Sequence, residues 1–148
     1  MKKLAEIQTS LVVEEKVDAV YEKAKDIEGL AEYLPDLEEV RILRREKNMV
    51  ESFWKGVFQG REVKWTERDY WDDENKECRF EAVEGDFKLY RGIWRFNLEG
   101  ESKTRVDLEI EYDLGLPLVG PLINTFLKKK MLENARAMLN ALEKSLHG

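Results

Sequence analysis

The chain has 148 residues, of which 43% are hydrophobic and 10% aromatic. It is long enough for one folded domain with a sizeable core, which we expect over residues 1–148, and too hydrophobic for a disordered chain. Its 25 Lys and Arg residues against 31 Asp and Glu give a net charge of -6, which argues against binding of the phosphate backbone of DNA or RNA.

The first predicted element is a strand, and two short helices follow it. Apolar side chains alternate with polar ones from Ala5 to Val13, as in a strand with one buried face. Apolar residues then recur at helical spacing from Val17 to Ile27, and Gly29 is expected to interrupt this helix. A second short helical turn is expected to end at Pro35, because proline does not continue a helix.

From about Leu37 to Leu114 the hydrophobic pattern has a period of two, which predicts six strands. Turn-forming residues interrupt this pattern at 46–48, 59–60, 72–75, 84–86 and 99–100. Connections this short join only antiparallel neighbours, because parallel strands need a crossover of about a dozen residues or more. We therefore expect an antiparallel meander.

The last two of these strands have clearly assigned faces. The final strand alternates without exception over residues 104–113, which places Leu108 and Ile110 on its inner face. The strand before it directs four residues inward: Tyr90, Gly92, Trp94 and Phe96. We expect its outward Arg91 and Arg95 to pair with carboxylates of the final strand, at about 0.2–1 kcal/mol for each exposed pair.

The period returns to 3.6 between Pro121 and Leu146, which predicts one helix of about 26 residues. Pro121 suits the first turn, where its missing N–H costs no hydrogen bond. The apolar stripe of this helix consists of Ile123, Leu127, Met131, Ala135, Met138, Leu142 and Leu146. The predicted order is therefore one strand, two short helices, six strands and one long helix.

This order of elements resembles the START-like superfamily, and within it the polyketide cyclase/dehydrase and coenzyme Q-binding proteins. The segments that carry the resemblance are GIWRF at 92–96, TRVDL at 104–108 and LPLVGP at 116–121. The resemblance implies an α+β helix-grip fold, in which a curved antiparallel sheet of about seven strands wraps around a long C-terminal helix. It also implies a cavity between sheet and helix that takes lipids, quinones, hormones or polyketides. It implies no catalytic residues, because the superfamily has no common catalytic signature.

Aromatic residues of the sheet are candidates for the wall of such a cavity, although the same residues would also suit an ordinary core. Trp and Tyr combine large apolar faces with one polar group. The predicted ligand-binding residues are Trp54, Trp65, Tyr90, Trp94, Phe96, Leu108, Ile110, Leu127, Met131, Asn134 and Met138.

Two polar residues could act inside the pocket. Asn134 falls within the apolar arc of the long helix, where its amide would bond a ligand, an ordered water or a sheet side chain. Glu67 is separated from Trp65 and Trp71 by an even number of residues, so in a regular strand all three side chains point inward. Burial there would raise the pKa of the Glu67 carboxyl. A β-bulge would turn Glu67 outward, and we favour the bulge. No catalytic residue is predicted, and Glu67 and Tyr90 are the candidates if the pocket catalyses a reaction.

An apolar segment around the start of the long helix is expected to lie at the pocket entrance. Its residues are Leu116, Leu118, Val119 and Phe126. They would form a lid, contact a second copy of the chain, touch a membrane transiently, or pack against the two short helices.

Several chemistries are excluded by residue types that the chain lacks. Cys78, the single cysteine, is expected to be buried, and no Cys or His spacing suits zinc. His147, the single histidine, lies near the chain end, which excludes a Ser/His/Asp or Cys/His mechanism. We expect no metal and no cofactor. The lone thiol, the early Glu6 and Gln8 and the lack of a long apolar run predict a cytoplasmic protein.

The leading functional prediction is a non-catalytic binder or carrier of an apolar molecule such as a lipid, quinone, isoprenoid or polyketide-like compound. A second hypothesis is a cyclase or dehydratase that uses the same pocket. A third is an interaction module that binds a protein partner through its surface. The chain is expected to be a monomer or a homodimer. Its 38% charged residues are a feature reported for proteins from hot environments.

Overall fold

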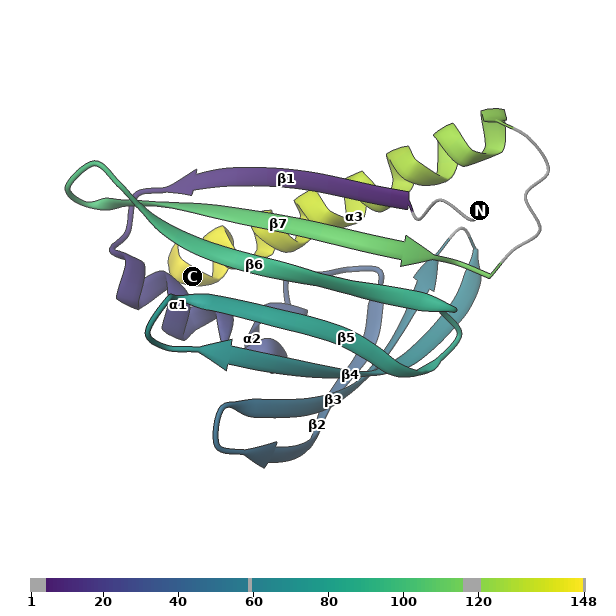
Figure 1. Cartoon of the computed structure of the whole chain (residues 1–148), viewed down its shortest axis with the longest axis horizontal. Helices are drawn as coiled ribbons and strands as arrows, with labels where there is room; N and C mark the ends of the chain where they lie inside the picture. The colour runs from purple at the N-terminus through teal and green to yellow at the C-terminus, as the bar shows by residue number, and fades with distance from the viewer. Residues whose placement is uncertain (1–4, 59, 116–120, 148) are drawn as a thin grey trace.

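A curved seven-stranded antiparallel sheet packs against one long helix in this protein (Figure 1). The computed structural model describes residues 5–58, 60–115 and 121–147, with 121–124 described by their backbone. This architecture is the α+β helix-grip fold that the sequence predicts, in the predicted order of elements. Within the described residues, no helix combines the length and the apolar character that crossing a bilayer requires.

The elements follow one another with short connections. The chain starts with β1 (Ala5–Val13), α1 (Val17–Ala24) and α2 (Ile27–Ala31). It continues through β2 (Leu37–Glu46), β3 (Met49–Phe58), β4 (Arg61–Asp72), β5 (Glu77–Gly85), β6 (Leu89–Glu99) and β7 (Lys103–Asp113). The last element is α3 (Pro121–His147), with 27 residues.

The strand order in the sheet is β1-β7-β6-β5-β4-β3-β2, so β1 and β2 are the two edges. The first strand therefore pairs with the last, and Ile7 lies opposite Ile110. Helix α3 crosses the concave side and contacts β1, β7, α1 and α2 (Figure 1). Its strand contacts are with β1 and β7 at one edge of the sheet, whereas α2 contacts β2 at the other edge.

The break between the two short helices differs from the prediction. The helical pattern stops at Lys25 and Asp26, not at Gly29, which lies inside α2. The Asp26 carboxylate caps α2 by accepting a hydrogen bond from the Gly29 N–H at 3.1 Å. A Cβ on Gly29 would collide with this carboxylate, so the glycine here serves the cap.

The buried side of α3 is broader than the predicted stripe. Met131, Ala135 and Leu142 are buried as expected, and Leu139 and Ala141 are buried as well. Nothing is described of the side chain of Ile123.

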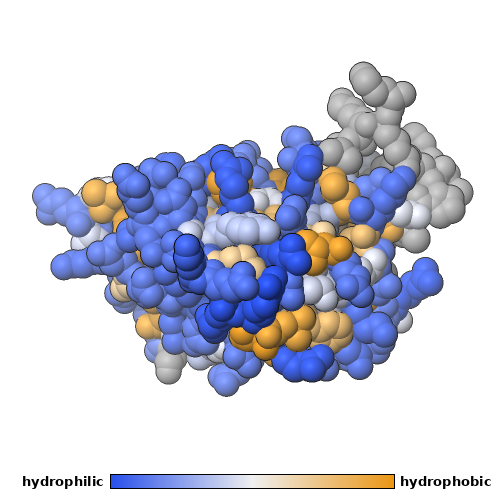
Figure 2. All heavy atoms as spheres, turned by 60° about the horizontal axis from the view of Figure 1, so that its bottom comes forward, coloured by the Kyte–Doolittle hydropathy of each residue, from blue (hydrophilic) through white to orange (hydrophobic). Residues whose placement is uncertain are grey.

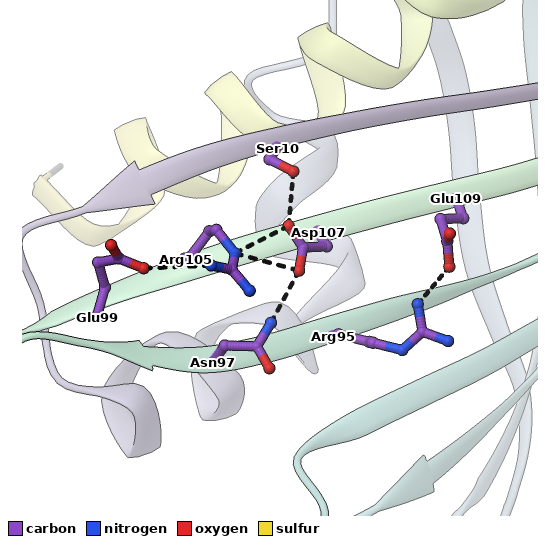
Figure 3. A network of polar contacts seen from close by, with 7 residues as sticks. All are labelled: Ser10, Arg95, Asn97, Glu99, Arg105, Asp107 and Glu109. Carbon is purple, nitrogen blue, oxygen red and sulfur yellow. Dashed lines mark hydrogen bonds and ion pairs between the residues drawn. The ribbon is translucent and has the colours of Figure 1, made fainter.

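The outer face of the sheet carries the predicted ion pairs. Arg91 contacts Glu111 at 3.4 Å, and Arg95 contacts Glu109. Asp107 joins three strands, since it accepts hydrogen bonds from Ser10 on β1 and Asn97 on β6 (Figure 3). Hydrophilic residues cover most of the face in Figure 2, with hydrophobic residues in small groups between them.

Candidate ligand-binding cavity

A cavity of about 200 Å³ lies between the concave face of the sheet and α3. For comparison, an apolar protein cavity of about 150 Å³ accommodates benzene. Its lining combines residues 34–37 before and at the start of β2, the inner faces of β3 to β7, and α3. The lining residues of the sheet and its turns are Trp54, Gly56, Val57, Phe58, Val63, Trp65, Glu67, Phe80, Phe87, Tyr90, Trp94, Leu108 and Ile110. Those of α3 are Met131, Asn134, Ala135, Ala137 and Met138.

A continuous aromatic wall forms one side of the cavity. Trp54 and Trp65 are register partners on β3 and β4, and their rings lie 5.7 Å apart at an interplanar angle of 9°. Phe87, in the β5–β6 turn, packs edge-on against Trp65 at 5.1 Å and stacks on Tyr90 at 5.0 Å. The register of β3 and β4 therefore positions the two indoles, and Phe87 connects Trp65 to Tyr90 from the turn.

The floor of the cavity depends on one glycine. Gly92 of β6 faces inward between Tyr90 and Trp94, and a Cβ there would lie 2.5 Å from the Phe80 ring. The absence of a side chain at this position therefore lets Phe80, from β5, extend under the cavity and line it.

Glu67 faces the cavity, so the prediction that a bulge turns it outward is wrong. A bulge does occur beside it, since Thr66 pairs with Glu84 while Glu67 pairs with Ala82. The extra residue, Val83, therefore belongs to β5, and β4 keeps its alternation. Glu67 is 7% exposed and accepts a hydrogen bond from the Trp65 indole N–H at 3.0 Å.

A second carboxyl lies beside Glu67 and was missed by the sequence analysis. Asp69 is two residues further along β4, on the same face, and is 5% exposed. Its Oδ1 atom has no hydrogen-bond partner among the described residues. The alternation of β4 could have predicted its position, because Asp69 lies on the same face of the strand as Trp65, Glu67 and Trp71.

Burial raises the pKa of both carboxyls above their usual range. The pKa of Asp69 is raised further by the charge of Glu67, whereas hydrogen bonds from Asp69 and Trp65 counteract the rise for Glu67. Burial, and then the charges of Glu67 and Asp69, raise the pKa of Tyr90, so its hydroxyl stays protonated.

Ser52 adds a further polar group close to the pair. It is fully buried on β3 directly opposite Glu67, and its hydroxyl accepts a hydrogen bond from the Trp54 indole N–H at 2.8 Å. The two indole N–H groups of the aromatic wall are thus both satisfied by polar side chains of the same strands.

The cavity includes most of the predicted ligand-binding residues. Those that line it are Trp54, Trp65, Tyr90, Trp94, Leu108, Ile110, Met131, Asn134 and Met138. Phe96 lies away from it and packs edge-on against Tyr21 at 5.4 Å. Leu127 is half-buried on α3, one turn before the lining residues begin. Asn134 is exposed at the cavity rim, not buried as predicted.

The predicted entrance is described only at Phe126. Leu116, Leu118 and Val119 lie outside the described residues. Phe126 is 48% exposed, and the Lys130 ammonium lies 5.5 Å from its ring centroid. The cavity lining also includes residues outside the predicted set: 34–37, Gly56, Val57, Phe58, Val63, Phe80, Phe87, Ala135 and Ala137. Residues 34–36 could not be predicted from periodicity, because they lie in an irregular segment before β2.

Other candidate chemistries are absent from the described part of the chain. There, no three His, Cys, Asp or Glu side chains are positioned to hold a metal ion. Cys78 is buried, as predicted, and burial raises the pKa of its thiol well above the usual range.

The sequence model of the family described as polyketide cyclase / dehydrase and lipid transport matches residues 13–139. The chain belongs to this family. A protein of Thermus thermophilus is 39% identical, with a TM-score of 0.91, and the match covers 96% of this chain and 97% of that one. No curated protein matches the sequence.

More distant members of this fold are also similar in structure. The Zhui aromatase/cyclase from a Streptomyces species has a TM-score of 0.88 at 19% identity, with 98% of this chain and 94% of that chain covered. A START superfamily protein from Mycobacterium smegmatis has a TM-score of 0.81 at 18% identity, with 96% and 97% covered. At these identities the likeness establishes the fold alone.

Proposed function

We propose that the chain binds an apolar, ring-containing small molecule in the cavity between the sheet and α3. The aromatic wall carries this proposal, because it offers flat apolar faces on several strands around one space. Burial of about 300 Å² of ligand at roughly 25 cal/mol per Å² contributes about 7–8 kcal/mol before several kcal/mol of association cost. Such modest net affinity suits a carrier of a lipid, quinone, isoprenoid or polyketide-like molecule, since the carrier must also release it.

Native mass spectrometry tests this proposal directly. The protein is purified from its source cells without detergent, and bound molecules are extracted with organic solvent and identified. We expect one apolar molecule per chain. A chain that is empty in repeated preparations, and that binds no compound of a panel of apolar ring compounds, would contradict the proposal.

Two neighbouring aromatic residues provide a matched pair of variants. Trp94 lines the cavity and stacks at 6.3 Å on Phe96, which lies outside the lining. Trp94→Leu and Phe96→Leu both remove aromatic packing, and each is expected to lower the free energy of unfolding by about 1–3 kcal/mol. Only Trp94→Leu should lower the amount of bound ligand. Equal ligand loss in both folded variants would place the ligand elsewhere.

A second candidate function is acid–base catalysis, and the Glu67–Asp69 pair is the observation that favours it. In a dehydration, Glu67 would take the proton from the carbon beside a carbonyl, and the Tyr90 hydroxyl would protonate the departing hydroxyl, which leaves as water. Reprotonation of Tyr90 by solvent and release of the proton from Glu67 would close the cycle. The family description, polyketide cyclase / dehydrase and lipid transport, makes polyketide-like carbonyl compounds the substrates to test.

Turnover of such compounds would distinguish an enzyme from a carrier. We expect Glu67→Gln to abolish any turnover while ligand binding persists, because an amide cannot accept the proton. Turnover that survives in the folded Glu67→Gln variant would exclude this mechanism. Binding without turnover in the unaltered protein would leave the carrier function.

A further inference from the structure

The charged side chains that line the cavity are all acidic. Among the described lining residues, Glu67 and Asp36 carry ionisable carboxyls, and neither Lys, Arg nor His is present. A ligand with a carboxylate or phosphate inside the cavity would therefore meet like charge and no counter-charge, which is unfavourable in a low-dielectric site. The lining selects against anionic ligands.

Glu67 also lacks a cationic partner within the described structure, although it is buried. Its carboxyl is hydrogen-bonded to the Trp65 indole N–H at 3.0 Å and to the Asp69 carboxyl, and its register neighbours on β3 and β5 are Ser52 and Ala82. The arginine next in sequence, Arg68, points to the other face and bonds Glu51 at 2.8 Å. Buried carboxylates are normally paired with a cation or fully hydrogen-bonded. The described neighbours of Glu67 supply hydrogen bonds but no positive charge, so a counter-charge would have to come from the cavity that Glu67 lines.

The rings around Glu67 have the chemistry that attracts a cation. Trp65 and Tyr90 lie 5.8 Å apart, Tyr90 lies 5.7 Å from Phe80, and Trp54 continues the wall on β3. Aromatic faces attract ammonium groups within about 6 Å of the ring centroid, most strongly where water is excluded. The missing counter-charge and the attracting faces thus coincide in one place.

We propose that the cavity selects a protonated organic amine whose apolar ring body lies against the aromatic wall and whose ammonium group contacts Glu67. This inference rests on the proposed function, and it names the ligand class. A cavity of about 200 Å³ suits an amine with one or two fused rings. Asn134 and Asp36 at the rim add further acceptors for the N–H groups of a longer amine.

The test uses three probes that share one ring and differ in charge: naphthylmethylamine, naphthylmethanol and naphthoate, as the same positional isomer. Affinities are measured at pH 7 by calorimetry and by quenching of tryptophan fluorescence. We expect the amine to bind at least about tenfold more tightly than the alcohol, and the acid most weakly. In Glu67→Gln the amine should lose this advantage, while the affinity for the alcohol changes less than about threefold.

Glu62→Gln is the matched control, because Glu62 lies on the same strand, is exposed and bonds Lys55 at 3.5 Å. It removes the same charge from an exposed position of β4 and should leave the affinities for all three probes unchanged. Should Glu67→Gln fail to fold, the comparison of the three probes on the unaltered protein still decides.

Each other result overturns the inference in a recognisable way. An alcohol that binds the unaltered protein as tightly as the amine refutes amine selectivity but leaves the proposed binding function intact. An amine preference that persists in folded Glu67→Gln, or that disappears in Glu62→Gln, places the cation at another site. Failure of all three probes to bind refutes both the inference and the proposed function.

Discussion

At the scale of one residue, Asp69 is an ionisable group buried beside Glu67, which lines the cavity. Its carboxyl is buried beside Glu67 and takes part in no ion pair within the described residues, so the charged form is disfavoured. A carboxyl whose pKa is raised on folding binds a proton in the folded chain at a pH where the unfolded chain has released it. Asp69 therefore links folding to proton uptake.

We predict that the free energy of unfolding falls as pH rises above about 4, the unfolded value for Asp, towards the raised pKa of the folded state. The contribution is fully present below the unfolded pKa, and its slope for one proton reaches about 1.4 kcal/mol per pH unit. Asp69→Asn should flatten this slope, so the variant gains stability relative to the unaltered protein as pH rises above the unfolded value of Asp. Urea titrations at several pH values measure it.

Asp73 is the control of opposite sign. Hydrogen bonds from Lys25 at 2.8 Å and from the Tyr21 hydroxyl at 2.7 Å lower the pKa of its carboxyl. Its contribution is present above the unfolded pKa and lost as pH falls through the folded pKa. Asp73→Asn should therefore cost more stability at neutral than at acid pH. The same pH trend in both variants would contradict the assigned directions.

At the scale of elements, the regular strands could be predicted from the sequence because each has one buried face. The alternation of β7 over residues 104–113 and the parity of Trp94 and Tyr90 on β6 assigned their faces correctly. The same parity argument, applied without an exception, would also have placed Glu67 and Asp69 inside. The error came from choosing a bulge on β4 when the bulge lies on β5.

A period of hydrophobic residues does not reveal which strand of a pair takes the extra residue. The bulge at Val83 leaves an exposed valine on β5. In the sequence, this exposed residue two positions before Gly85 resembles the end of a strand at a turn. The contact of Phe80 with Gly92 depends on the register between β5 and β6, which the hydrophobic period does not determine. Helix ends depend on caps, and the Asp26 side chain decided the break that Gly29 was expected to make.

At the scale of the whole molecule, the helix and the curved sheet hold open a space that a tighter packing would fill. A void of about 200 Å³ costs up to about 5 kcal/mol if it is empty, at roughly 24 cal/mol per Å³. Proteins retain such destabilising features where function requires them. Filling the space should then stabilise the fold and remove the function together.

Ala135 allows a test of this relation between stability and binding, because it lies on α3, is buried and lines the cavity. Ala135→Leu extends into free space, so we predict an increase of about 1–2 kcal/mol in the free energy of unfolding. For a chain of this length that corresponds to a melting temperature higher by about 2–8 °C. Calorimetry measures the shift, and the same variant should bind apolar ring compounds at least about tenfold more weakly.

Ala141 is the matched control, since it lies on the same helix, is equally buried and belongs to the packed core outside the cavity lining. Ala141→Leu has no space to occupy and should destabilise the chain by about 1–3 kcal/mol. If Ala135→Leu destabilises as much as Ala141→Leu, the cavity is not usable space and the binding proposal loses its basis. If Ala135→Leu stabilises the chain without weakening binding, the ligand occupies another site. We expect Ala135→Leu to stabilise the chain and to lose binding, and Ala141→Leu to destabilise it and to keep binding. This result would show that the space that lowers the stability of the fold is the space that the ligand occupies.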